Sequence, residues 1–158
     1  MIKYVAMRKF ISILILFLSF VTKGNSQTAS DSVTATVKQM FLAMKNSDGN
    51  QLQNCFADSA ILQTIVNNKE GKAIVKNEAV ADFINQINKI GKGDADERIS
   101  IDFMKIDGDL AIVWTPYQFY YKGKFSHCGV NSFHLIRTVN GWKVQYLIDT
   151  RRKTGCVS

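Results

Sequence analysis

The residues best suited to acid–base chemistry in this chain are His127 and Asp149. An imidazole titrates near neutral pH without special help, so His127 is a candidate general acid or base. Asp149 lies near the end of an apolar segment, and a carboxylate in a partly apolar pocket is a candidate general base. Each also has a structural interpretation. His127 could be a hydrogen-bonded residue at a sheet edge, and Asp149 could be the ion-pair partner of Arg151.

A second group of side chains is suited to holding a flat organic ligand. Trp114 and Tyr120 offer aromatic faces on which a ring can stack, although such residues also suit a dimer interface. Arg151 and Arg152 point to opposite faces of a strand, so at most one can hold a carboxylate or phosphate in a pocket. A solvated strand end is the alternative for both arginines. The predicted ligand-binding residues are Trp114, Gln118, Tyr120, His127, Asn131 and Arg152.

Three strand-like segments joined by two-residue turns position these residues. Residues 112–121 are predicted to pair with 125–139 across Gly123-Lys124, and 125–139 with 142–152 across Asn140-Gly141. Asn-Gly between apolar alternations is the strongest short-range signal for a hairpin.

The register of these hairpins decides which side chains share a face. With Lys122 opposite Phe125, and Val139 opposite Trp142, one face collects the six predicted ligand-binding residues. The other face collects Tyr117, Asp149 and Arg151. A slip of one residue or a β-bulge would exchange these assignments.

The segments before residue 112 alternate between helical and extended patterns. Helices followed by an antiparallel meander indicate one α+β domain over residues 27–158, with helices covering one face of a curved sheet. Such a sheet leaves a pocket at its open end. The predicted elements are helices over 31–45, 52–56 and 77–90, strands over 61–66, 73–75 and 99–106, and a polar loop over 91–97.

Residues 1–26 have the pattern of a secretory signal peptide. Basic residues precede an apolar stretch over 10–21, and Gly24 and Ser26 fit a cleavage site before Gln27. A membrane anchor is the alternative, but about 12 apolar residues fall short of the roughly 20 that span a bilayer. We therefore expect an exported protein, periplasmic or extracellular, with no membrane span after cleavage. The remaining 132 residues contain 16 basic and 13 acidic residues, a net charge of +3 that does not predict nucleic-acid binding.

Three cysteines follow the predicted signal peptide. In an oxidising compartment a Cys128–Cys156 disulfide is plausible, because the predicted register places Cys128 opposite Lys153, three residues before Cys156. Cys55 is interpreted as a buried small hydrophobic residue. A metal site is not expected, since the chain lacks a CxxC pair and its two histidines fall on opposite faces. No cofactor is expected.

Four segments carry a resemblance to a known fold: 40–44 (MFLAM), 55–62 (CFADSAIL), 106–113 (IDGDLAIV) and 141–144 (GWKV). They resemble the nuclear transport factor 2-like (NTF2-like) superfamily, whose cone-shaped α+β fold is shared by ketosteroid isomerases, scytalone dehydratase and SnoaL-like cyclases. The resemblance covers nearly all of residues 30–153. It implies a strongly curved antiparallel sheet with N-terminal helices on its concave face.

A narrower resemblance rests on residues 126–130 (SHCGV) with 149–152 (DTRR). These segments are similar to small secreted bacterial proteins provisionally assigned as lumazine-binding. The catalytic tyrosine and paired carboxylates of ketosteroid isomerases have no match identified from the sequence.

Together these observations predict a secreted protein that binds a small, flat organic molecule in the cone pocket and forms a homodimer through its sheet. The alternative is an enzyme of the isomerase, dehydratase or cyclase type, working without a cofactor and using Asp149 or His127 as general base. A scaffold with a filled cone is a third interpretation.

Overall fold

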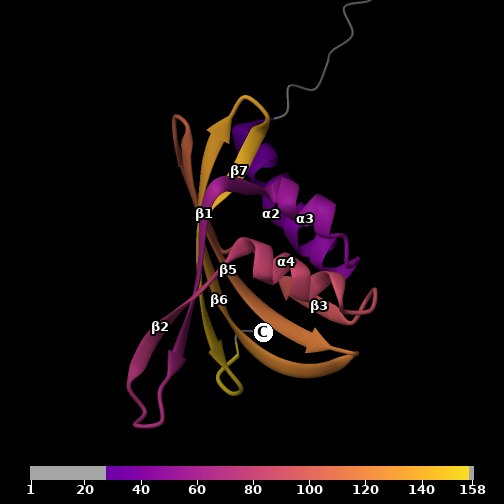
Figure 1. Cartoon of the computed structure of the whole chain (residues 1–158). Helices are drawn as coiled ribbons and strands as arrows, with labels where there is room; N and C mark the ends of the chain where they lie inside the picture. The colour runs from indigo at the N-terminus through magenta and orange to yellow at the C-terminus, as the bar shows by residue number, and fades with distance from the viewer. Residues whose placement is uncertain (1–27, 157–158) are drawn as a thin grey trace, which may run out of the picture.

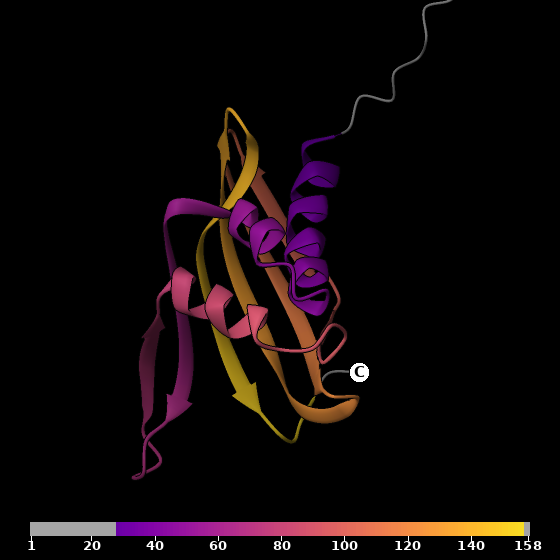
Figure 2. The same ribbon diagram turned by 45° about the vertical axis from the view of Figure 1, so that its right-hand side comes forward.

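The computed structural model describes residues 28–156, which form three helices and a seven-stranded curved sheet. The predicted signal peptide, residues 1–26, lies outside the described residues. The helices lie on one side of the sheet (Figure 1) and remain there when the molecule is turned (Figure 2). The predicted α+β fold, a curved sheet with N-terminal helices on its concave face, is confirmed. The helices are α2 (Ala29–Lys45), α3 (Gly49–Cys55) and α4 (Val80–Asn88).

Helix α2 begins and packs as its sequence predicts. Thr28 and Asp31 form a capping box, in which each side chain accepts a hydrogen bond from the other residue's backbone N–H. Apolar residues recur at helical spacing along the helix and are buried against the sheet, among them Met40, Phe41 and Met44. None of the helices within residues 28–156 is long and apolar enough to cross a bilayer.

The sheet has the strand order β2-β1-β7-β6-β5-β3, and β4 also pairs with β5. All pairs are antiparallel except β1 with β7, which is parallel. The strands are β1 (Phe56–Asn67), β2 (Ala73–Glu78), β3 (Ala95–Ile99), β4 (Phe103–Asp107), β5 (Leu110–Tyr121), β6 (Lys124–Thr138) and β7 (Gly141–Arg152).

The segment between α4 and β5 differs from the prediction. The sequence predicted a polar loop over 91–97 and one strand over 99–106, whereas the structure has the two strands β3 and β4, both paired with β5. Backbone hydrogen bonds from Ser100 to Pro116 and from Asp102 to Trp114 hold the connection between them along β5. Strand β3 was missed because it is mostly charged, so apolar alternation does not reveal it.

Both hairpins form as expected, but each turn lies one residue earlier than predicted. The turn residues are Lys122-Gly123 and Val139-Asn140, and a bulge interrupts each ladder, at Phe119/Tyr120 and at His134/Leu135. Lys122 and Gly123 both have positive φ, of 51° and 74°, as the tightest hairpin turn requires.

The shifted register corrects the predicted grouping of faces. Tyr117 pairs with Gly129, and Asn131 pairs with Asp149, so the inner face carries Tyr117, Asn131 and Asp149 together. Trp114 pairs with Ser132 on the outer face instead. One residue of slip was enough to exchange faces because side chains alternate along a strand.

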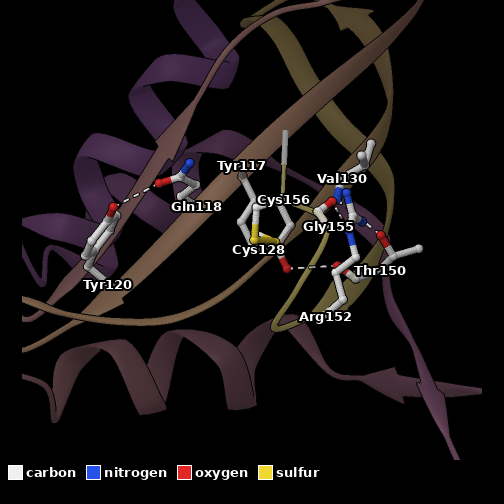
Figure 3. The surroundings of a disulfide bond; sticks show 9 residues. All are labelled: Tyr117, Gln118, Tyr120, Cys128, Val130, Thr150, Arg152, Gly155 and Cys156. Atoms are coloured by element: carbon white, nitrogen blue, oxygen red, sulfur yellow. Dashed lines mark hydrogen bonds between the residues drawn. A yellow bond between two sulfur atoms is a disulfide. The ribbon is translucent and has the colours of Figure 1, made fainter. Parts of the chain in front are cut away.

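The Cys128–Cys156 disulfide considered from the sequence is present. It joins β6 to the tail that follows β7, with 5.7 Å between the two Cα atoms (Figure 3). Cys128 pairs with Arg152 rather than Lys153, and Arg152 Nε donates to the Gly155 carbonyl oxygen, which turns the tail back toward β6. Cys55 is the free, buried cysteine among the described residues.

We expect loss of this disulfide to lower the free energy of unfolding by about 3 kcal/mol, because it closes a loop across 28 residues of sequence separation. Cys156→Ala tests this by urea denaturation, since it leaves Cys128 as a small buried side chain. Reducing agent should destabilise the wild type to the same extent and leave Cys156→Ala unchanged. Equal effects of reductant on both proteins would contradict the prediction.

Candidate functional site

A row of polar side chains crosses the inner face of the sheet. Thr64 on β1 pairs with Asp149 on β7, which pairs with Asn131 on β6, which pairs with Thr115 on β5. Asp149, Asn131 and Thr115 expose only 9%, 4% and 0% of their surface. The neighbouring row, from Leu62 to Val113, is apolar and joins the core beneath the helices. Polar residues thus cross the sheet immediately beside its apolar interior.

The polar row is incompletely satisfied at both ends. The hydroxyls of Thr64 and Thr115 are buried and lack a hydrogen-bond partner within residues 28–156. An unsatisfied buried hydroxyl costs about 1–3 kcal/mol, so such groups usually indicate a missing water or ligand.

Tyr117 reaches across β6 to join this row. Its hydroxyl donates to the Thr150 carbonyl oxygen at 2.9 Å and lies 3.2 Å from Oδ2 of Asp149, so its single proton is shared between the two acceptors. Gly129, the strand partner of Tyr117, leaves the space that the ring crosses. Burial, followed by the charges of Asp149 and Glu97, raises the pKa of Tyr117, which keeps the hydroxyl protonated as a donor.

Glu97 approaches the row from β3. Its Oε1 accepts a hydrogen bond from Asn131 Nδ2 at 2.8 Å. The residue keeps part of its surface exposed, but the carboxyl group itself lies deep within the protein. Burial, with the Asp149 charge adding to it, raises the pKa of Glu97 to about 7, although the Asn131 hydrogen bond and Arg151 act in the opposite direction. A carboxyl group that titrates near neutral pH can both accept and return a proton.

Asp149 is held by a charged partner. Arg151 Nε donates to Asp149 Oδ2 at 2.8 Å, so the ion pair considered from the sequence is present. Burial acts to lower the pKa of Arg151, but the Asp149 charge and hydrogen bond outweigh it and the pKa is raised. The guanidinium therefore stays charged beside the carboxylate.

Thr64, Glu97, Asn131, Asp149 and Arg151 line a cavity of about 70 Å³ between the sheet and the helices. Met40, Phe41 and Met44 of α2 and Phe83 of α4 form its apolar wall. A liquid water occupies roughly 30 Å³, so the cavity has room for about two waters or one very small molecule. The polar wall consists of Gln63, Thr64, Glu78, Glu97, Asn131, Asp149 and Arg151.

His127 lies on the inner face beyond this cavity. Its ring packs 5.7 Å from that of Tyr117 and 5.1 Å from that of Phe119, and Nδ1 lies 3.1 Å from the Ser126 hydroxyl. Burial and the Arg151 charge lower its pKa, so the ring is mainly neutral at pH 7.

The residues predicted from the sequence therefore fall in different places. Asn131 and Asp149 line the cavity, whereas Trp114 lies on the outer face with 44% of its surface exposed. Tyr120 donates to Gln118 Oε1, and Arg152 faces the C-terminal tail (Figure 3). The structure brings together Asn131 and Asp149 with three residues that sequence reasoning did not place in the pocket, Glu97, Thr64 and Tyr117. The roles of Trp114, Gln118, Tyr120, His127 and Arg152 in ligand binding stay predictions.

A wider, open groove of about 870 Å³ lies outside the cone, between α2, α3 and the β6–β7 hairpin. Its ionisable side chains, as far as residues 28–156 show, are Cys55, Arg137 and Lys143. Burial raises the pKa of the Cys55 thiol. Neither a carboxyl group nor an imidazole is among the described lining residues of this groove, and we consider the inner cavity the better candidate site.

Solved structures with the same architecture provide the comparison. A protein of unknown function from Silicibacter pomeroyi is 18% identical, with a TM-score of 0.61, and the match covers 79% of this chain and 99% of that one. A Shewanella baltica protein, also of unknown function, is 12% identical with a TM-score of 0.59 over 78% and 93% of the two chains. Both are NTF2-like proteins. This chain has the NTF2-like fold.

A third NTF2-like structure, from Streptomyces avermitilis, carries the provisional assignment of dehydratase. It is 14% identical, with a TM-score of 0.57 over 78% of this chain and 96% of that one. No family model and no curated protein matches the sequence. Identities this low establish the NTF2-like fold alone, so function has to be argued from the cavity. Within residues 28–156, no group of three or more His, Cys, Asp or Glu side chains could hold a metal ion.

We expect Gly129→Ala to be strongly destabilising. A Cβ at this position would lie 1.7 Å from the Thr150 carbonyl oxygen and 2.8 Å from Tyr117 Cε1, so the strands and the ring would both have to move. The expected loss in the free energy of unfolding is about 3 kcal/mol or more, measured by urea denaturation. Gly91→Ala is the control, because its Cβ would meet only the flexible Asp94 side chain. Similar small losses in both variants would show that Tyr117 does not depend on Gly129.

The raised pKa of Glu97 predicts a pH-dependent stability. Protonated Glu97 contributes stability that is fully present below the unfolded pKa of 4.5 and is lost as the pH rises through about 7. Between pH 5 and pH 8 the wild type should therefore lose about 2 kcal/mol more unfolding free energy than Glu97→Gln, which keeps an acceptor for Asn131. Urea denaturation at both pH values measures this. Parallel pH profiles would mean that Glu97 titrates as an ordinary carboxyl group.

Proposed function

We propose that this protein binds a small organic molecule in the inner cavity and exchanges a proton with it through Glu97. The observation that carries the proposal is a buried carboxyl group with a pKa of about 7 beside a second carboxylate, Asp149, at the wall of a cavity. Perturbed carboxyl groups in a pocket are typical of acid–base catalysts. The proposal keeps the enzyme alternative drawn from the sequence and moves the general base from Asp149 or His127 to Glu97.

The chemistry would be a proton transfer within one substrate, as in an isomerase or a dehydratase. The Glu97 carboxylate would take a proton from carbon, and the electron pair of the broken C–H bond would stay on the substrate. The same carboxyl group would then return the proton at another position, or to a leaving hydroxyl group. Asp149, fixed by Arg151 and Tyr117, would orient the substrate through hydrogen bonds.

The cavity supports a compact substrate. At about 70 Å³ it is smaller than the roughly 300–1,000 Å³ of pockets for drug-sized ligands. Met40 and Met44 form part of its wall, and methionine side chains change rotamer readily, so the apolar side can enlarge more easily than the strand side. The Thr64 hydroxyl, which has no hydrogen-bond partner among the described residues, supports ligand binding in general, since a ligand there would supply that partner.

Export and dimerisation belong to the same proposal. Removal of residues 1–26 would deliver the domain to the periplasm or the exterior. The outer sheet face, with the exposed Trp114 between Ile112 and Pro116, would pair with a second copy of the chain.

Hydrogen exchange at carbon tests the proton transfer without knowledge of the product. Acetone, dihydroxyacetone and aminoacetone are incubated with the protein in deuterated buffer at pH 7.5, and ¹H NMR measures the exchange of their C–H hydrogens for deuterium. The protein should accelerate this exchange for at least one of the three ketones. Glu97→Gln should lower this acceleration about 100-fold or more, since general bases contribute roughly 10²–10⁴ to such rates. Glu70→Gln, at an exposed turn, is the matched control and should exchange like the wild type.

The non-catalytic alternative gives a different result. Native mass spectrometry of protein purified from its own host would then find a small molecule bound in stoichiometric amount, and no ketone would exchange faster than in buffer. That combination would support the proposal that the protein binds a small molecule and would contradict the proposal that Glu97 exchanges a proton with it.

A further inference from the structure

We infer that the inner cavity selects a compact organic cation whose N–H groups donate to Glu97 and Asp149. This inference rests on the proposed function of the cavity and adds the chemical class of its substrate. It follows from the imbalance of charge and of hydrogen-bond acceptors along the polar wall.

The polar wall carries more negative than positive charge. Glu78, Glu97 and Asp149 face the cavity, and Arg151 is the cationic side chain among its described lining residues. Arg151 Nε donates to Asp149, so its charge is balanced in part within the wall. The helices contribute Met40, Phe41, Met44 and Phe83 to the lining, so they add no countercharge. An anionic ligand would meet repulsion at this wall, and a cation would balance it.

Two other titratable groups near the wall, His127 and Tyr117, do not change this balance. Lys76 on β2 pairs with Thr64, but it is exposed and is not among the described lining residues. His127 is mainly neutral at pH 7 and the Tyr117 hydroxyl remains protonated, as their shifted pKa values indicate. Glu78 accepts a hydrogen bond from Gln86 at 2.7 Å.

The free acceptors point to a ligand rich in donors. Among the residues that the structure describes, the hydrogen bonds of the cluster engage Oε1 of Glu97 and Oδ2 of Asp149. Oε2 and Oδ1 remain to receive donors, and the Thr64 hydroxyl can accept as well. An amidine or ammonium group supplies two or three N–H donors from one small centre.

The proton transfer itself favours a cationic substrate. When a neutral ketone loses a proton to a base, negative charge appears on its oxygen and requires dedicated donors. Here Asn131 Nδ2 already donates to Glu97 and Arg151 Nε to Asp149, which leaves the Thr64 hydroxyl and the remaining N–H groups of Arg151 and Asn131 as the donors of the wall. An amidinium or iminium cation that loses a proton from the adjacent carbon takes the electron pair into its C–N bond and becomes a neutral enamine-type product, so it does not depend on an oxyanion site. The wall is thus suited to a substrate that starts with the positive charge.

Three isosteric probes test the charge preference: acetamidinium, acetamide and acetate, each with four heavy atoms. Binding is followed by the shift of the Asn131 side-chain amide signal in ¹⁵N-resolved NMR. We expect the dissociation constant of acetamidinium to be at least tenfold lower than that of acetamide, and we expect acetate not to bind. The affinity for acetamidinium should rise about five- to tenfold from pH 6 to pH 8 as Glu97 ionises. For acetamide the affinity should change little.

Two variants make the test specific to the cavity. Glu97→Gln should remove both the pH dependence and most of the preference for acetamidinium, whereas Glu70→Gln should retain both. Urea denaturation would establish that Glu97→Gln is folded.

The outcomes separate this inference from the proposed function. Tighter binding of acetamide or acetate than of acetamidinium would overturn the inference and leave a binding cavity. Lack of binding by all three probes would also overturn it, while Glu97-dependent deuterium exchange into a neutral ketone would still uphold the proposed function. Acetamidinium binding without ketone exchange would uphold the charge preference and count against proton transfer.

Discussion

The structure depends on one constraint: four polar side chains must cross the sheet beneath a layer of apolar helices. Thr64, Asp149, Asn131 and Thr115 lie side by side on β1, β7, β6 and β5, and burial forces each to find a partner within the protein or in a ligand. The central pair succeeds through Arg151, Tyr117 and Glu97. The hydroxyls of Thr64 and Thr115, at the two ends, have no partner within residues 28–156. A slip of one residue between any two of these strands would place some of these groups on the opposite face of the sheet.

The surrounding elements are arranged so that the row stays buried yet reachable. Gly129 lets Tyr117 cross a strand and reach the backbone of β7, and the disulfide anchors the tail beside the same strands. On the other side, methionine and phenylalanine from two helices cover the carboxyl groups with adaptable apolar surface. The low dielectric that this cover creates explains why a glutamate here holds its proton up to neutral pH.

The sequence was sufficient for the fold and insufficient for the site. The two hairpins and the first long helix could be predicted because turn residues and apolar periodicity are local signals. The Cys128–Cys156 disulfide was a possibility that the sequence left open, and it is present. The predicted register was wrong because the turns were misplaced by one residue and because no local pattern predicts the two bulges. As a result, Trp114 was assigned to the wrong face, and Asn131 and Asp149 were assigned to different faces. Glu97 was missed for another reason. Glu97 lies in the segment Asp94–Arg98, in which four of the five residues are charged. This part of the chain forms strand β3 by pairing with β5, a tertiary contact that the local sequence does not reveal. The charges made a loop the simpler prediction.

A purely structural role for the cluster would produce a different arrangement. Buried polar networks that serve only to fix a register are stable when every donor and acceptor is satisfied, and apolar residues of similar size would often be more stable still. Here the carboxyl group of Glu97 is buried at the cost of a raised pKa, two hydroxyls lack partners within residues 28–156, and a cavity adjoins one of them, that of Thr64. Each feature lowers stability, and all of them occur at one place in an otherwise apolar interior. Local rules of stability are most often broken together where a ligand completes the structure. The incomplete row is therefore better explained by a molecule that enters the cavity than by the fold alone.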